Sequence, residues 1–202
     1  MTSETKTRPY NKRRRAEAEA ETRTRIAEAA MKLHGSVGPA RTTISAVAER
    51  AGVQRATVYR HFPDEEALFG ACSAHWASLH PPPDPGAWAN VADPDERLRA
   101  GLADIYAWYA SDVQMFVNTR RDAALVPAMA KPVAAVQAGL AVMVDTLMKG
   151  RPERGRRRQR ALAAIRHATA FGTWYSLTRE GELSDGEAVE LMAATVAAAA
   201  KR

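Results

Sequence analysis

The sequence predicts an all-α protein of about nine helices, with three short helices near the N-terminus and a larger helical bundle after them. Alanine supplies much of the 46% hydrophobic content, and alanine favours closely packed helices over sheets. Runs rich in Val, Ile, Thr and aromatic residues with a period of two do not occur, so no strand is predicted. Helix start and stop signals divide the chain into successive helical segments.

The first helix is predicted to begin at Glu17. Residues 1–15 are polar and basic and have no hydrophobic periodicity, so we expect a mobile arm there. The segment that follows consists of strong helix formers, and Gly35 marks its expected end. Its apolar residues fall on one face at helical spacing: Ile26, Ala29, Ala30 and Leu33.

Two short helices joined by a tight turn are predicted next. Thr42 or Thr43 is the expected N-cap of the first helix, and Gly52 supplies the positive φ that the turn needs. The second helix runs through "QRATVYRHF", and Pro63 interrupts it. Small and apolar side chains are spaced to hold the two helices together: Val47, Ala48, Ala51, Val53 and Val58.

A proline-rich connection separates the next two helices. Asp64 is the expected N-cap of the first, and residues 81–90, "PPPDPGAWAN", are expected to form an extended connection because proline cannot continue a helix. Asp93 as N-cap, Pro94 at the first helical position and Glu96 in the first turn mark the second helix. Its apolar stripe contains Leu98, Leu102, Ile105, Tyr106 and Tyr109.

Three further helices are predicted toward the C-terminus. Pro127 and Pro132 bound short pieces before a helix over residues 134–150. Residues 151–160, "RPERGRRRQR", are expected to form a charged, solvated loop, although a second nucleic-acid surface is an alternative. A helix over Ala161–Arg179 follows.

The last helix, Ser184–Ala199, is predicted from its start signal. Ser184 and Glu187 have the spacing of a capping box. Residues at helical spacing define its expected inner face: Ala188, Leu191, Met192, Thr195, Val196 and Ala199. The last two helices have small and apolar faces suited to a four-helix interface between two copies of the chain.

Positive charge is concentrated near the N-terminus. The chain has a net charge of +6; residues 1–62 hold 13 Lys or Arg against 6 Asp or Glu, whereas residues 63–202 hold 16 against 17. A basic end indicates a polyanionic partner for that end, and a solvated basic tail is the alternative.

Several classes of protein are disfavoured by the sequence. Cys72 is the one cysteine, so no internal disulfide forms and a reducing cytoplasm is expected, with Cys72 as a small buried side chain. No apolar run reaches the roughly 18 residues of a membrane span, and residues 1–15 have no apolar segment behind their charges, so we do not expect them to be a secretory signal. The GxSxG, HExxH, P-loop and dinucleotide patterns do not occur, and the histidines lack metal-ligand spacing. We therefore expect no enzyme, no cofactor and no metal.

The helix over residues 54–62 presents an unusual polar surface. With Val53 and Val58 turned inward, most of the other side chains face outward: Gln54, Arg55, Thr57, Tyr59, Arg60 and His61. Arginine reads guanine through two hydrogen bonds, glutamine reads adenine, and tyrosine or threonine contacts phosphates or a thymine methyl. Together with the basic N-terminus, this pattern favours a helix-turn-helix that binds DNA.

The segment "TTISAVAERAGVQRATVYRHF", followed by "PDEEAL", resembles the DNA-binding segment of the TetR (tetracycline-repressor) family. The resemblance covers roughly residues 22–70, and "RIAEAAMKLHG" occupies the place of the family's first helix. The remaining two thirds of the chain agrees only in length and helical layout. The resemblance implies a homodimeric, ligand-responsive transcription factor, usually a repressor, with each recognition helix in a major groove.

The resemblance also implies which residues contact DNA. The family's contacts correspond to Thr43, Gln54, Arg55, Thr57, Tyr59, Arg60 and His61. The family commonly has a phosphate-binding lysine just after "HF", but this chain has Glu65 there, and a carboxylate repels phosphate. Basic residues of the N-terminal arm are expected to compensate through minor-groove or phosphate contacts: Lys12, Arg13, Arg14 and Arg15.

The C-terminal region is expected to bind a small apolar or aromatic effector. Each aromatic or methionine residue there, taken singly, is also explained as an ordinary side chain of the hydrophobic core. As a group they suggest an apolar pocket. The candidate lining residues are Trp76, Tyr106, Trp108, Tyr109, Met115, Phe116, Met129, Met143, Phe171, Trp174 and Tyr175.

The expected organisation is a basic flexible arm (residues 1–16), a helix-turn-helix DNA-binding domain (17–63) and a ligand-binding and dimerisation domain (64–202). The favoured function is a cytoplasmic regulator that leaves a palindromic operator when it binds its effector. Two alternatives remain: a ligand-binding or scaffolding homodimer without sequence-specific DNA binding, and an all-helical enzyme.

Overall fold

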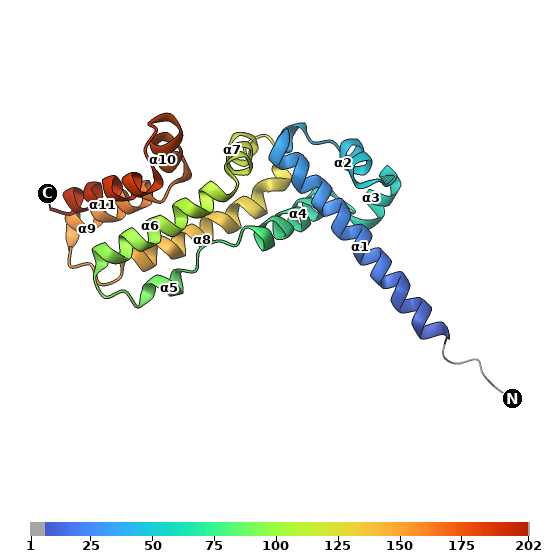
Figure 1. Ribbon diagram of the computed structural model, residues 1–202, viewed down its shortest axis with the longest axis horizontal. Coiled ribbons are helices and arrows are strands. Elements are labelled where there is room, and N and C mark those ends of the chain that lie inside the picture. Colours follow the sequence, from blue (N-terminus) through green and yellow to red (C-terminus); the bar gives the residue numbers. More distant parts are fainter. Residues whose placement is uncertain (1–6, 202) are drawn as a thin grey trace. The chain divides into compact units, whose positions relative to one another are not determined.

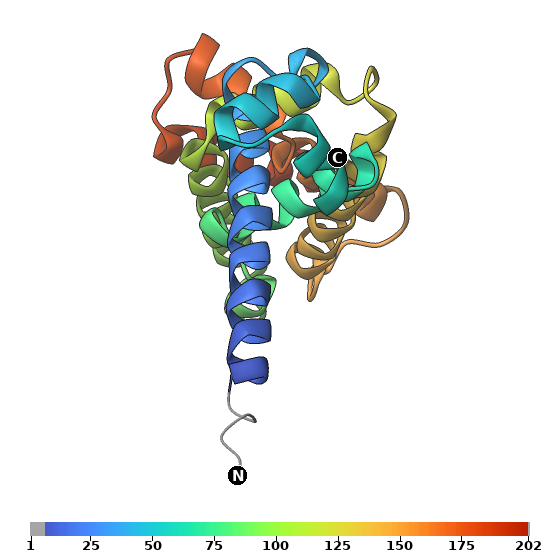
Figure 2. The ribbon, with the colours of Figure 1, turned by 90° about the vertical axis from the view of Figure 1, so that its right-hand side faces the viewer.

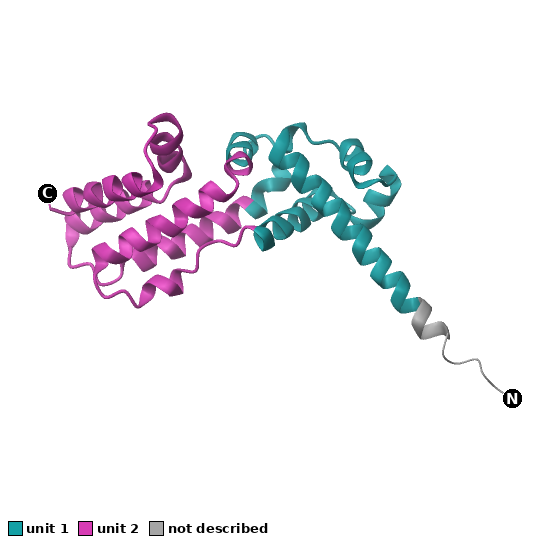
Figure 3. Cartoon of the chain, viewed as in Figure 1, with its two compact units in different colours: residues 1–79, 117–132 teal, residues 80–116, 133–202 magenta. Residues whose placement is uncertain are grey.

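The computed structural model describes residues 7–201, with side chains from Lys12 onward, and every regular element among them is helical (Figure 1). The predicted fold class is thereby confirmed, with eleven α-helices in place of about nine. Two compact units make up the chain (Figure 3): residues up to Leu79 with Val117–Pro132, and His80–Phe116 with the residues from Val133 onward.

The first helix is longer than predicted. α1 (Thr7–Ser36) includes most of the segment expected to be a mobile arm, and residues 1–6 lie outside the described residues. Arg13 Nε donates to Glu17 Oε1 at 2.8 Å, one turn further on, and Lys, Arg, Ala and Glu are all good helix formers. Apolar periodicity reports burial and not helicity, so its lack did not exclude a helix. Lys12–Arg15 therefore lie on an exposed helix (Figure 2).

The core of the first unit lies where α1 meets α2 (Ile44–Ala51), α3 (Arg55–His61) and α4 (Glu65–Leu79). Asp64 is the N-cap of α4, as predicted, because its Oδ1 accepts from the Ala67 amide at 2.7 Å. The fully or nearly buried side chains of this core include Ile26, Ala30, Val47, Val58, Phe62, Leu68 and Cys72.

The end of α1 is held by the second half of α7 (Val113–Asp122), which from Val117 onward belongs to the same unit as α1. The Asn118 side-chain amide donates to the carbonyl oxygens of His34 and Gly35, both at 2.9 Å, which satisfies carbonyls that lack partners at a helix end. Gly38, with φ of 96°, makes the following turn, whereas Gly35 was the expected stop. A short 3₁₀ turn, η1 (Pro39–Arg41), then leads to α2.

The proline-rich connection contains a helix that was not predicted. α5 (Pro85–Ala89) begins at Asp84, whose side chain accepts from the Gly86 amide at 2.8 Å. Pro85 occupies the first turn, where its missing N–H costs nothing. Trp88 is 2% exposed and its Nε1 donates to Asp104. The expectation of an extended connection was therefore wrong here, because proline was read only as a helix breaker.

Two buried arginines organise one end of the second unit. α6 (Pro94–Ser111) has the predicted Asp93 cap and buries the predicted apolar stripe. Arg97 donates to the carbonyl oxygen of Val91, just before α6, and to that of Lys149, just after the end of α8 (Ala130–Met148). Arg151 reaches Asp95 at 3.0 Å.

α8 follows η2 (Pro127–Met129) and is apolar but mostly exposed. By length and composition alone, Pro127–Met148 would suffice to cross a membrane, contrary to the sequence expectation. Core helices of soluble proteins also meet this criterion but are mostly buried, whereas this segment is 17% buried. Lys131 and Asp145 bound its uncharged part.

The arginine-rich segment is largely helical. α9 (Gly155–Ala168) begins five residues into the expected loop, since arginine and glutamine are good helix formers. The single helix expected over Ala161–Arg179 is interrupted at Thr169, whose hydroxyl donates back to the Ile165 carbonyl oxygen at 3.0 Å. A short helix, α10 (Phe171–Tyr175), and a π-helical turn, η3 (Ser176–Glu180), follow.

The last helix has the predicted start but a different inner face. α11 (Asp185–Lys201) follows the predicted capping box: the Ser184 amide donates to Glu187 Oε2 at 2.8 Å. Val189 and Ala193 are buried in place of Leu191 and Thr195, so the helix is rotated by part of a turn from the expected orientation. Leu191 is consequently 44% exposed.

Candidate nucleic-acid interface

The helix-turn-helix is built as its sequence requires. Thr43 is the N-cap of α2, since its Oγ1 accepts from the Ala46 amide at 3.1 Å. Gly52 adopts the left-handed conformation, with φ of 64° and ψ of 39°. This backbone conformation is strained for residues that have a side chain and favours glycine. The Val53 amide then donates to the Ala48 carbonyl oxygen at 3.0 Å. These bonds fix the direction in which α3 leaves α2.

The polar residues of α3 lie mostly on its exposed side. Val58 is 1% exposed and anchors the helix, whereas Tyr59 is 49% exposed. The structure leaves most of the predicted contact residues accessible to a ligand: Thr43, Gln54, Arg55, Tyr59 and Arg60 are exposed, and Thr57 is half-buried. The sequence pattern of inward valines and outward polar residues is thus reproduced, and DNA contact by each residue stays a prediction.

His61 differs from its neighbours on α3. Its side chain is half-buried, and its Nε2 atom is buried without a hydrogen-bond partner among the described residues. Because one of its two ring nitrogens is buried, the imidazole presents less polar surface than the sequence indicated. The predicted DNA contact of His61 stays a prediction.

Arg23 of α1 was missed by the sequence reasoning. Its guanidinium donates to the carbonyl oxygen of His61 and lies over the Phe62 ring, 4.1 Å from the ring centroid. It therefore caps the C-terminal end of α3 and ties it to α1. Its spacing was a usable signal, because Arg23 lies one turn before Ile26 on the buried face of α1.

Acidic residues occupy the start of α4. Glu65, which stands where the family pattern has a lysine, is exposed in the first turn. There it benefits from the helix dipole. Its neighbour Glu66 accepts from Lys131 Nζ at 2.5 Å. Glu65 thus has a local structural role, but it adds a negative charge close to the end of α3.

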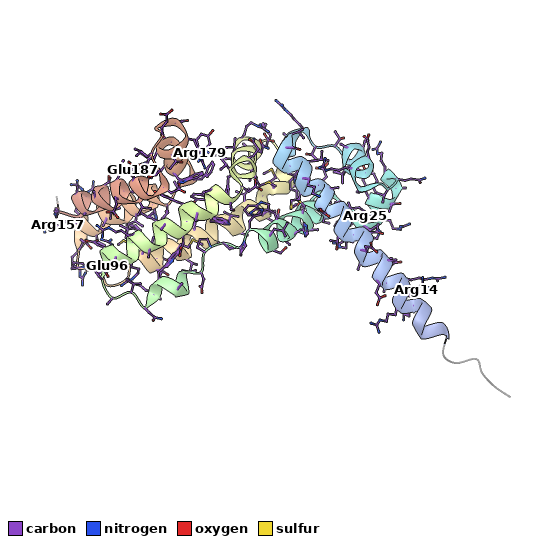
Figure 4. The ribbon with its side chains drawn as sticks, viewed as in Figure 1. Arg14, Arg25, Glu96, Arg157, Arg179 and Glu187 are labelled. Atoms are coloured by element: carbon purple, nitrogen blue, oxygen red, sulfur yellow. The ribbon has the colours of Figure 1, made fainter. Side chains whose placement is uncertain are left out.

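Exposed cations line the N-terminal part of α1. The side chains of Lys12, Arg13, Arg14 and Arg15 are all exposed, as are those of Arg23 and Arg25 (Figure 4). Residues 17–21 add three glutamates between these groups. A helix fixes the spacing of the cations, whereas a mobile arm would not. This surface is suited to contacts with a polyanion.

Buried polar groups surround the end of α1 within the first unit. The carboxylate of Asp122 accepts from Arg121 and from the Ala40 amide, and the Arg121 hydrogen bond holds the Asp122 pKa below its usual value. Burial lowers the pKa of His34 to about 4, against a smaller opposite effect of Asp122. Burial also raises the pKa of the Cys72 thiol to about 12, which keeps it protonated and unreactive. The expectation of Cys72 as a buried side chain is confirmed.

Most of the candidate effector residues gather in one aromatic cluster in the second unit. Phe171 lies at its centre, 5.3 Å from both Tyr109 and Phe116 by ring centroids. Trp108, Trp174 and Tyr175 extend the cluster at 4.9–5.6 Å from Phe116 or Phe171. Tyr109–Phe171 and Trp108–Phe116 are edge-to-face pairs and Phe116–Phe171 is a stacked pair, and such pairs are typical of a packed core.

The hydroxyls of the two tyrosines are used internally. Tyr106 and Tyr109 donate to the carbonyl oxygens of Ala168 and Thr169 at 2.9 and 2.8 Å, and burial raises the pKa of both phenols. Met143 lies on α8, whereas Trp76 and Met129 belong to the first unit. The predicted set is therefore only partly brought together.

Comparisons with known proteins agree with this geometry. Residues 26–72 match the model for bacterial regulatory proteins of the tetR family. Among solved structures, a TetR transcription regulator from Haloarcula marismortui ATCC 43049 is similar, with a TM-score of 0.57 and 15% identity over 90% of this chain and 97% of that one. A TetR transcriptional regulator from Rhodococcus sp. RHA1 is similar with a TM-score of 0.51 and 22% identity, with the same coverage. No curated protein matches.

Proposed function

We propose that this chain is a DNA-binding transcription regulator of the tetR family, that it represses transcription from a palindromic operator and that a small apolar effector releases it. The observation that carries the proposal is α3, which is anchored by Val58 and exposes Gln54, Arg55, Tyr59 and Arg60. An anchored helix with an exposed polar face fits a major groove. The expectation of a regulator and not an enzyme agrees with the family match.

The exposed cations of α1 support a second contact. We propose that Lys12, Arg13, Arg14 and Arg15 bind phosphates or the minor groove beside the site read by α3. These contacts would offset Glu65, whose carboxylate replaces the family's phosphate-binding lysine. Phosphate contacts position a protein without specifying sequence, so Arg55, near the start of α3, is the better candidate for reading a base.

A homodimer through the last two helices is part of the proposal, because a palindrome is read by two equivalent recognition helices. Dimeric readers place their half-sites about 34–36 Å apart, so a small change in the separation of the two helices is enough to lower affinity. An effector acts in this way only if it binds the two conformations with different affinities. The regulator would act in the cytoplasm.

Two features support an apolar effector and its coupling to α1. The exposed face of α8 has no charged side chain from Pro132 to Val144, and an apolar molecule would remove that surface from water. α7 provides a covalent path: its Phe116 belongs to the aromatic cluster, whereas its Asn118 binds the last carbonyls of α1.

A scaffolding homodimer without sequence-specific DNA binding is the alternative that Glu65 favours. A gel-shift titration of the full chain separates the two functions, with its own upstream DNA and a scrambled duplex of equal length as probes. A regulator binds the upstream DNA at least about 1,000-fold more tightly at physiological salt. Equal, salt-sensitive binding to both duplexes would support the scaffold and contradict the proposal.

A further inference from the structure

The direction of α9 within the second unit is set by hydrogen bonds at both of its ends. Just before α9, Arg151 binds Asp95 at 3.0 Å, at the start of α6. At the end of α9, the Thr169 carbonyl oxygen accepts from Tyr109, near the end of α6. α9 therefore runs parallel to α6.

α11 runs in the opposite direction. Its first residue, Asp185, accepts from Trp174 Nε1 at 2.8 Å, and Trp174 lies on α10, just beyond the end of α9. Its Glu190 pairs with Arg99 at 3.1 Å, in the first half of α6. α9 and α11 pack together, so the start of α9 lies beside the end of α11 (Figure 1).

The two ends of this antiparallel pair carry opposite charges. Residues 151–160 hold six arginines and one glutamate, and Lys201 at the end of α11 adds a further cation there. Residues 179–190 hold five acidic residues, all exposed, and one arginine. The exposed Arg166 in the last turn of α9 adds a second cation at this end, so the acids remain in excess. Arg157 and Glu187 mark the two ends in Figure 4.

These charges do not neutralise each other within one chain. Glu187 and Lys201 are fourteen positions apart, which is about 20 Å of helix at about 1.5 Å per residue. That separation exceeds the Debye length of about 8 Å at physiological ionic strength, so the two clusters are screened from one another. Arg151 is buried against Asp95 and Glu190 pairs with Arg99, and the exposed remainder of each cluster is available to an external partner of opposite charge.

Small and apolar side chains are exposed between the two charged ends. Leu191 is 44% exposed on α11, and Ala194 and Ala198 are exposed further along the same helix. Ala163 is exposed on α9. Small residues allow two helix pairs to approach closely, so this face suits a packed helical interface.

We infer that this face binds a second copy of the chain in antiparallel register, so that the arginine-rich start of α9 meets the acidic start of the partner's α11. The inference rests on the proposed homodimer and adds its register. A two-fold axis perpendicular to the helices places each charged end over its opposite, twice per dimer. A two-fold axis parallel to the helices would place arginines on arginines and acids on acids, which is repulsive. The charge pattern therefore selects between the two arrangements.

Charge-reversal variants of the full chain test the register by sedimentation equilibrium. The basic variant carries Arg156→Glu and Arg157→Glu, and the acidic variant carries Glu180→Lys and Glu182→Lys, both at exposed positions. Each should raise the dimer dissociation constant at least about tenfold in 50 mM salt, because each reverses two symmetric contacts. A chain with all four substitutions should return to within about threefold of the natural sequence, because the charges are then complementary again.

Two measurements complete the test. A control variant carries Arg50→Glu and Arg120→Glu, both at exposed positions of the first unit. It has the same change in net charge as the basic variant and should leave the dimer dissociation constant unaltered. Circular dichroism checks that each variant is folded. The inference is overturned if the basic variant dimerises as well as or better than the natural chain. It is also overturned if the variant with all four substitutions dimerises as weakly as the variants with two. A chain that is monomeric but selects an operator also overturns it while leaving the DNA-binding function intact.

Discussion

The guanidinium of Arg23 lies 4.1 Å from the centroid of the Phe62 ring, and this pair joins the first helix to the end of the recognition helix. The same guanidinium donates to the carbonyl oxygen of His61. Phe62 is 1% exposed, so the ring cannot move without disturbing the core. Arg23 thereby fixes the position of α3 without belonging to its exposed face.

Arg23→Met should lower stability by about 1 kcal/mol, because it removes a cation–π contact and a hydrogen bond at a partly exposed site. Operator affinity should fall several-fold while base preference is unchanged, since α3 loses order but no base contact. Thermal unfolding and gel shifts measure the two effects. Arg25→Met, exposed on the same helix, is the control. Equal stability of the two variants would contradict this role of Arg23.

Arg55→Ala should relax sequence preference at one base position of each half-site, at a cost of about 1–3 kcal/mol. Lys12→Ala should instead weaken binding to all sequences alike, because a phosphate contact carries no base information. Competition with single-base operator variants measures both. If Arg55→Ala leaves every base preference intact, Arg55 does not read a base.

Two variants test whether the helical form of residues 12–15 matters for DNA binding: one removes their charges, and the other keeps the charges but breaks the helix. Removing residues 1–15 takes away six Lys or Arg, and it should reduce the slope of log K against log salt by about 3–4 if Lys12–Arg15 are the ones among them that bind phosphates. Ala16→Pro keeps the charges but breaks the helix, and should lose much of the same affinity. Ala16→Ser is the matched control. Full affinity with Ala16→Pro would show that a flexible arm suffices.

Glu65→Lys should strengthen operator binding several-fold at low salt and steepen its salt slope by about 1, because it restores a cation near the DNA backbone. Glu65→Gln should give a smaller gain from the loss of repulsion alone. Glu66→Lys, whose side chain is turned to Lys131, is the control for net charge. No gain from Glu65→Lys would place this position away from DNA.

His34 should make stability depend on pH. Its pKa falls from 6.5 to about 4 in the folded state because it is buried, so the unfolded chain binds the proton more readily. Its contribution is complete above pH 6.5 and is lost as the pH falls toward 4, at up to about 1.4 kcal/mol per pH unit. Urea unfolding of the natural chain and of His34→Gln should give curves that diverge over this range. Parallel curves would contradict a neutral, buried His34.

The sequence predicted the helix-turn-helix well because its signals are local. Thr43 as N-cap, Gly52 in the turn and the inward Val58 each depend on residues within one turn of helix. The capping signals of Asp64, Asp93 and Ser184 succeeded for the same reason.

The errors arose where a local signal was ambiguous or a distant partner decided the structure. Residues 7–15 lacked apolar periodicity, yet exposed helices do not need it. α9 ends just before Thr169, whose carbonyl oxygen accepts a hydrogen bond from the Tyr109 hydroxyl. The two residues are 60 positions apart in the sequence. Arg23 and Asn118 also act through partners far along the chain. The spacing of Arg23 places it one turn before Ile26, but spacing names no partner for either residue.

Selection of bound DNA from a random pool by the full chain tests the central claim most directly. Two equivalent recognition helices predict an enriched palindrome whose half-site centres are about 34–36 Å apart or a multiple of that distance. One base position in each half should lose its preference when the selection is repeated with Arg55→Ala. An enriched sequence without two-fold symmetry, or a pool that shows no enrichment, would contradict a dimeric regulator that reads its operator through α3.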